Sequence, residues 1–177
     1  MIIAIISGII TILAIIALIA KLKSNLLTNY RIKLDIAEKE LEAILGEKLS
    51  LLSELQNKLA ERESDVEFNF LCNLEDINDN EFKLNSILNK AYKELKDFIG
   101  EKRSFIPDDE IKEKLEKLYQ VDTECIATKE YYNNISILLN DKIKKFPNNI
   151  IAKWNNIQKK ELYNDPIEEE FEILKKK

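Results

Sequence analysis

The chain opens with an uninterrupted apolar run. Positions 2–20 carry no charged residue, and twelve of these nineteen positions are Ile or Leu. A helix of this length rises about 28 Å, close to the hydrocarbon thickness of a bilayer. A dozen Ile and Leu contribute on the order of −5 kcal/mol to insertion, which outweighs the small penalties of Ser7 and Thr11. The pattern predicts a membrane-spanning helix, with residues 1–22 as an anchor and residues 23–177 as a helical bundle domain.

After this run, apolar residues recur at intervals of three and four, the spacing of one helix face. No Pro interrupts the pattern before residue 63, so it predicts one helix from about residue 2 to about residue 63. The apolar stripe consists of Tyr30, Leu34, Ala37, Leu41, Leu45, Leu49, Leu52, Leu55 and Leu59.

The same spacing predicts further helices over about 81–99 and 108–145, with a stripe in the latter that ends at Phe146 and is broken by Asp122. Gly100 is expected to end the former in the left-handed conformation, and Pro107 to begin the latter. Asn80 and the polar residues before it are expected to cap a helix. Short helical pieces are expected near 149–159 and 166–174, and residues 64–80 are left as either a connection or a helix continuation.

The first and third helices have similar lengths outside the anchor and both carry an apolar stripe, so we expect them to pair antiparallel. The shorter second helix would complete the packing. The predicted fold is therefore all-α: an N-terminal transmembrane helix continuing into an elongated antiparallel bundle of three to four helices. Because the second helix is shorter, this bundle would leave part of the pair formed by the first and third helices without a third helix against it.

A cleaved signal peptide is the competing interpretation of the apolar run. It fits less well, because no Lys or Arg precedes the run and because Leu18 occupies the position where a cleavage site needs a small residue. Positive residues, beginning with Lys21 and Lys23, follow the run. The positive-inside rule then predicts a cell-membrane protein with its N-terminus outside and the bundle in the cytoplasm.

Composition removes several classes of function. The net charge is −5 with both signs interspersed, which disfavours nucleic-acid binding, and the chain contains no histidine. Without histidine, the commonest general base and metal ligand is missing, so we expect no metal, no cofactor and no catalysis. Gly and Pro, at three each, are too few for a β-rich fold. Cys72 and Cys125 are interpreted as small buried apolar residues.

One stretch of the third helix and the turn after it resembles a known pattern. Tyr132-Asn133 is followed by Asn140 seven positions after the first Asn, and then by Phe146-Pro147, Asn149 and Ile151-Ala152. This spacing is similar to that of the LemA family of bacterial single-pass membrane proteins. The order of an anchor, a long helix, a shorter helix and a second long helix also resembles that family. The Pro-containing segment that the family carries in its first helix is absent here, and Leu139 replaces its second Tyr, so the chain resembles a divergent member.

The resemblance implies a membrane-anchored helical bundle and no established activity. From the residues themselves, Asn133 and Asn140 lie on nearly the same helix face and could bond across a helix interface. Phe146-Pro147 would end the helix, and Asn148 or Asn149 would cap the next one. These residues are expected to serve packing and capping or, alternatively, to bind a partner.

The leading functional hypothesis is a non-catalytic interaction or scaffold protein that contacts the bilayer through residues 2–20 and an unknown protein partner. The alternatives are a self-assembling structural membrane protein and, less favoured, a carboxylate-based enzyme.

Overall fold

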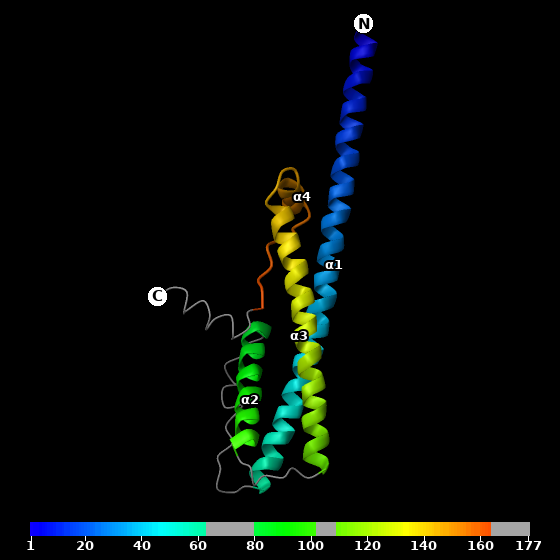
Figure 1. Ribbon diagram of the computed structural model, residues 1–177. Helices are drawn as coiled ribbons and strands as arrows, with labels where there is room; N and C mark the ends of the chain where they lie inside the picture. The colour runs from blue at the N-terminus through cyan, green and yellow to red at the C-terminus, as the bar shows by residue number, and fades with distance from the viewer. Residues whose placement is uncertain (63–79, 102–108, 164–177) are drawn as a thin grey trace, which may run out of the picture. The chain divides into compact units, whose positions relative to one another are not determined.

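A computed structural model describes residues 1–62, 80–101 and 109–163. These residues form four helices, and the described part of the chain contains no strand. The helices are α1 (Ile2–Arg62), α2 (Glu81–Glu101), α3 (Asp109–Ile143) and α4 (Asn148–Trp154) (Figure 1). The all-α prediction is confirmed, and the three longer helices begin and end within about two residues of the predicted positions. The predictions for residues 64–79, Pro107 and 166–174 lie outside the described residues.

The chain divides into two compact units. The first comprises Met1–Glu38 and Tyr131–Leu162, and the second comprises Lys39–Glu130 and Tyr163–Lys177. Both α1 and α3 contribute to each unit. The boundary between anchor and bundle at residue 22 stays a prediction.

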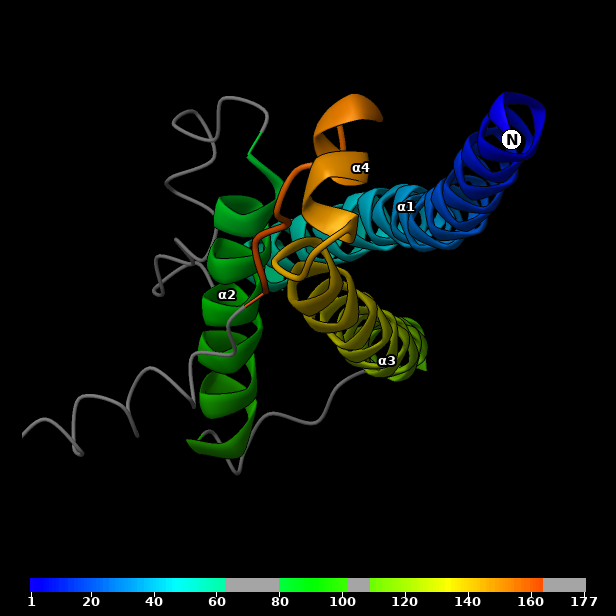
Figure 2. The ribbon, with the colours of Figure 1, turned by 90° about the horizontal axis from the view of Figure 1, so that it is seen from above.

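The first unit pairs α1 with α3 in antiparallel orientation. On α3, the Lys142 ammonium lies 5.9 Å from the centre of the Tyr30 ring of α1, and Tyr132, earlier on α3, bonds to Glu38, later on α1. Residue numbers therefore rise along one helix as they fall along the other. The short helix α4 lies beside the C-terminal end of α3 and, through Asn155, contacts Ser24 partway along α1 (Figures 1 and 2). The buried apolar side chains of this unit are Leu27, Leu34, Ala37, Tyr132, Ile135, Leu139, Ile151, Ala152 and Ile157.

The second unit adds α2 to an antiparallel α1–α3 pair (Figure 1). Apolar faces of all three helices are buried, including Leu52, Leu88 and Leu118. Lys58 pairs with Glu110, Lys117 with Glu47, and Lys114 with Glu54, so three ion pairs join α1 to α3 along the outside. The predicted completion of the long pair by the second helix is confirmed in this unit.

Two of the predicted stripe positions of α1, Tyr30 and Leu49, are not fully buried. Leu49 is only half-buried, and Lys48 is fully buried in its place, between Leu45 and Leu52. The α3 stripe likewise ends earlier than predicted, because Phe146 is 79% exposed. Leu139 is the last buried apolar residue of α3, and beyond it the helix packs through Asn140.

The helix ends confirm one predicted cap and correct another. Asn80 Oδ1 accepts a hydrogen bond from the Lys83 amide at 3.1 Å, which satisfies one donor at the start of α2 as expected. Gly100, in contrast, lies inside α2, and no described glycine has a positive φ. The α2 helix therefore continues for one residue past the glycine instead of ending there.

The helix predicted over 149–159 is shorter, because α4 ends at Trp154. Asn156 adopts a φ of 54°, and the amides of Asn156 and Ile157 bond back to the carbonyls of Lys153 and Ala152 at 3.2 and 2.8 Å. This is the Schellman arrangement, in which a left-handed residue closes a helix; Asn tolerates that conformation better than most residues. The turn redirects the chain, so residues 157–162 are not helical.

The N-terminal part of α1 is long and apolar enough to cross a membrane. Each large apolar side chain from Ile2 to Ile19 is between 45% and 84% exposed. Burial on α1 begins at Leu27, which is fully buried. One helix therefore carries a bare apolar segment followed by a packed amphipathic segment.

Candidate functional site

The residues that carry the resemblance all lie in the first unit, where one of them, Tyr132, contacts Glu38 of α1. Tyr132 is 1% exposed, and its hydroxyl donates a hydrogen bond to Glu38 Oε1 at 3.3 Å. The Lys160 ammonium donates to the same oxygen at 2.7 Å. Glu38 thus links α1, α3 and the segment after α4 through one carboxylate.

Asn140 holds that segment through its backbone. The Asn140 side-chain amide donates to the Lys160 carbonyl at 2.8 Å and accepts from the Lys160 amide at 2.9 Å. The expectation that Asn140 bonds across a helix interface is therefore wrong. A side-chain carboxamide has a donor and an acceptor side by side, as a backbone peptide group does. It can therefore bond to both the amide and the carbonyl of one residue.

The turn between α3 and α4 uses its asparagines differently from the prediction. Asn148 is buried, and its amide donates to the Lys142 carbonyl at 3.2 Å, so it closes the preceding helix. Pro147 occupies the N-cap position of α4, where no side chain caps the helix. Asn149 is exposed and accepts from the neighbouring Ile150 amide. The expected capping of α4 by Asn148 or Asn149 is therefore wrong.

The other residues of the resemblance divide between packing and surface. Ile151 and Ala152 are buried on the inner side of α4, which agrees with a packing role. Asn133 is half-buried on α3, and Phe146 is exposed. Two residues that sequence reasoning missed, Glu38 and Lys160, connect the group. Glu38 follows the stripe residue Ala37 directly, but nothing in the sequence around Lys160 indicates that it folds back against α3.

An open hollow of about 270 Å³ lies over this connection. Arg31, Asp35, Leu139, Asn156 and Lys160 are among its lining residues. Small-molecule sites usually occupy about 300–1,000 Å³ and enclose most of their ligand. An open hollow of this size is a surface depression suited to a contacting side chain more than to an enclosed metabolite.

The second unit contains a polar cluster around Lys48. The Lys48 ammonium donates to Asp122 Oδ1 at 2.6 Å and to Asn89 Oδ1 at 2.8 Å, and it lies 5.2 Å from the centre of the Tyr92 ring. The Lys48 side chain is completely buried, whereas that of Asp122 is 17% exposed. Asp122, which breaks the predicted α3 stripe, therefore does so because it neutralises a lysine inside the bundle.

The surface of this unit shows the expected electrostatic effects of pairing. The hydrogen bond from Lys114 lowers the pKa of the Glu54 carboxyl, and the same bond raises the pKa of Lys114. The hydrogen bond to Glu47 raises the pKa of Lys117. Burial, with a further contribution from Asp122, raises the pKa of the Tyr92 hydroxyl. The lysine and glutamate shifts belong to ion pairs that join α1 to α3. The Tyr92 shift belongs to a ring that lies against the Lys48 ammonium.

Cys125 is buried, with its Sγ 4.0 Å from Asn85 Oδ1, as expected for a small packed residue. Among the residues that the structure describes, no three His, Cys, Asp or Glu side chains gather where they could hold a metal ion.

Comparisons of the chain with protein-family models, with curated proteins and with solved structures find no match.

Replacing Asn140 with alanine is expected to release the segment around Lys160. Two hydrogen bonds are lost and the Lys160 backbone groups must find other partners, which costs about 1–3 kcal/mol. Amide hydrogen exchange at Lys160 should accelerate by roughly ten- to hundredfold if this segment opens locally. Asn134→Ala is the matched control, since Asn134 is exposed on the same helix. Equal exchange rates in the two variants would contradict the assigned role of Asn140.

Proposed function

We propose that this chain is a non-catalytic interaction protein of the LemA type, anchored in a membrane by the first part of α1. The observation that carries the proposal is the contrast along α1. Its apolar side chains are all exposed up to Ile19, and its packed core begins at Leu27.

The exposed apolar segment of α1 is energetically favoured in lipid over water. Contiguous apolar surface of this extent is rare on soluble proteins, because each exposed Ile or Leu side chain costs about 1.5–3 kcal/mol relative to burial. In a bilayer the same side chains are solvated, and the helix satisfies its own backbone hydrogen bonds. Thr11 donates to the Ser7 carbonyl at 2.9 Å, so this hydroxyl is also satisfied within the helix.

The proposed orientation places the packed part of the chain on the cytoplasmic side. Lys21 and Lys23 follow the apolar segment, and Arg31, Lys33 and Lys39 come next along α1, which favours the cytoplasmic side for this flank. Protease added to intact cells should then leave this part uncut, and protease added to opened cells should cut it. Cleavage in intact cells would reverse the assignment.

The proposed partner surface differs from the one expected from helix lengths. In the first unit, α4 and the residues after it contribute three buried apolar side chains, Ile151, Ala152 and Ile157. These residues therefore cover one side of the α1–α3 pair in this unit. Large apolar side chains nevertheless remain on the outside of this unit. They are Ile32 and Ile36 on α1 and Tyr131, Ile137 and Leu138 on α3, each 46–60% exposed. Exposed apolar residues at helical spacing are the usual anchors for a partner helix.

The LemA-type assignment is supported by what the shared residues do. In the first unit, Tyr132 bonds to α1 and Asn140 bonds to the segment after α4. Ile151 and Ala152 are buried on α4. A pattern that maintains one local arrangement can persist while the rest of a chain diverges.

The experiment that tests the interaction proposal is photo-crosslinking in cells from the full-length chain. A photoreactive residue at Ile36 should yield a defined covalent adduct with another protein, which mass spectrometry identifies. The same residue at Glu42, which is also exposed on α1 but points about 120° away on the helix, is the control. Adducts containing two copies of the chain would favour the self-assembling alternative. No adduct at Ile36 above the control would contradict the proposal.

A further inference from the structure

The helix α4 lies beside the point where the apolar segment of α1 ends. The Asn155 side-chain amide donates to Ser24 Oγ at 2.8 Å. Ser24 is four residues beyond Ala20, the last residue of the uncharged run, so it lies about 6 Å further along the helix axis. The headgroup layer of a bilayer extends roughly 5–8 Å beyond the hydrocarbon core on each side. The end of α4 is therefore held at the depth of the headgroups when residues 2–20 span the core.

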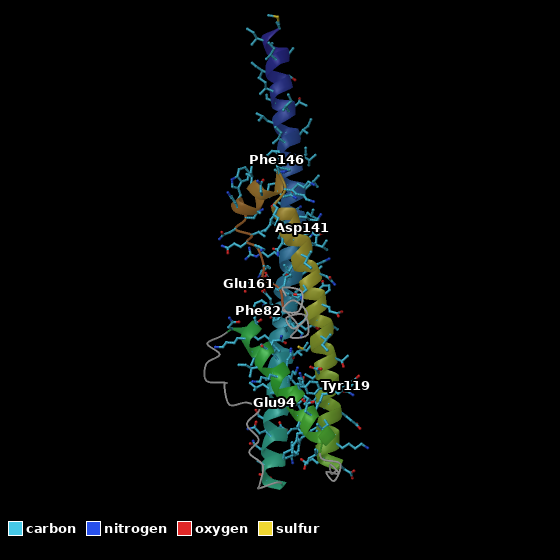
Figure 3. The ribbon with its side chains drawn as sticks, turned by 60° about the vertical axis from the view of Figure 1, so that its left-hand side comes forward. Phe82, Glu94, Tyr119, Asp141, Phe146 and Glu161 are labelled. Atoms are coloured by element: carbon cyan, nitrogen blue, oxygen red, sulfur yellow. The ribbon has the colours of Figure 1, made fainter. Side chains whose placement is uncertain are left out.

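The two most exposed aromatic side chains of the described residues lie near this depth. Phe146 is 79% exposed and Trp154 is 77% exposed, more than any other large apolar side chain described beyond residue 22. Figure 3 shows Phe146 at the end of α3 that lies toward the N-terminal segment of α1. Ile150, which lies four residues before Trp154 on the same face of α4, is 41% exposed. Trp and other aromatic residues are enriched at the membrane–water interface, where their ring surfaces leave water without entering the core.

The charges around these aromatic residues are mostly positive. Residues 142–155 contain four lysines and no acidic residue, and Lys144, Lys145 and Lys153 are exposed. An acidic residue just before this stretch, Asp141, has its carboxylate 3.9 Å from the Lys144 ammonium in an exposed pair. Lys21, at the end of the apolar run, is exposed as well. Each lysine near an anionic leaflet contributes about 1 kcal/mol of attraction.

We propose that α4 and the turn before it form a second membrane contact, which rests in the headgroup layer of the bilayer that α1 spans. Phe146, Ile150 and Trp154 insert at the boundary of headgroups and acyl chains, and Lys144, Lys145 and Lys153 contact anionic lipid headgroups. The inference rests on the proposed anchoring by α1. It adds that the first unit is fixed against the membrane surface by two elements, so that it cannot turn freely about its anchor.

Trp154 is the only tryptophan of the chain, so its fluorescence tests the inference without labelling. The full-length chain is reconstituted into phosphatidylcholine–phosphatidylglycerol vesicles, with and without bromine on the acyl chains. We expect blue-shifted emission, loss of intensity in the brominated vesicles, and protection from iodide in the surrounding buffer. The loss should be larger with phosphatidylglycerol than in phosphatidylcholine alone, and the triple variant K144Q/K145Q/K153Q should remove that difference.

Flotation of the same samples on a density gradient separates the two proposals. If the chain floats with the vesicles while Trp154 emits as in water and iodide quenches it, the second contact is wrong and the anchor stands. If the chain does not float, both proposals fail. Equal bromine quenching with and without phosphatidylglycerol would overturn the role of the lysines.

Discussion

Replacing Asp122 with alanine is expected to destabilise the second unit by about 3–5 kcal/mol, because it leaves the buried Lys48 ammonium without its counter-charge. Asn89 stays within hydrogen-bond distance but carries no charge. Urea unfolding of the full-length chain in detergent, followed by far-UV circular dichroism, should show a clear fall in the midpoint.

The reverse substitution is expected to cost less. In Lys48→Met, the side chain still fills the interior, and the Asp122 carboxylate, which is 17% exposed, can recover solvation from water. We expect a loss of about 1–3 kcal/mol. The double variant K48M/D122L should recover most of the stability, since a buried ion pair replaced by apolar residues of similar volume is often neutral or stabilising.

Lys117→Met and Glu47→Ala are the matched controls for these variants. They remove the two partners of an exposed ion pair between the same two helices, with side chains 57% and 45% exposed. Exposed pairs contribute about 0–1 kcal/mol, so each control should shift the midpoint only slightly. Equal effects at the buried and exposed pairs would show that the Lys48 cluster does not stabilise the unit as argued.

The second large effect is expected in the apolar segment. Arginine at both Ile10 and Ile12 adds about 5–7 kcal/mol to the cost of insertion, which exceeds the roughly −5 kcal/mol supplied by the Ile and Leu side chains. The variant should leave the membrane fraction of fractionated cells and collect in the soluble or aggregated fraction.

Arginine at Ile32 and Ile36 provides the control for this variant. These residues are exposed on the same helix but lie beyond the uncharged run, so the control should remain in the membrane fraction. If both double variants remained there, attachment would depend on something other than residues 2–20.

Helix positions could be predicted from the sequence because they follow from short-range patterns. The spacing of the leucines and isoleucines specifies α1, α2 and α3, and Asn80 provides a local capping pattern. Gly100 misled the prediction, since a glycine can end a helix but also fits inside one. The early end of α4 depends on the left-handed conformation of Asn156. Such a helix end is usually recognised in a sequence by a glycine, and none is present here.

The contacts of the candidate site were harder to predict because they join distant parts of the chain. Lys48 is three residues after Leu45 and four before Leu52, and Asp122 is four after Leu118 and three before Cys125. Two opposite charges at stripe positions could have indicated their pairing. The partner of Asn140 could not have been inferred this way, since Lys160 lies in a non-helical segment with no periodicity. Phe146 continues the α3 spacing but lies beyond its last buried apolar residue.

The proposal for α1 is that residues 2–20 are retained and embedded in lipid. It is tested most directly by washing membranes from cells that express the full-length chain with alkaline carbonate, and then identifying the N-terminal peptide by mass spectrometry. We expect the chain to stay in the membrane pellet with residues 2–20 attached. A chain that is released by the wash, or that is found soluble without these residues, would contradict it.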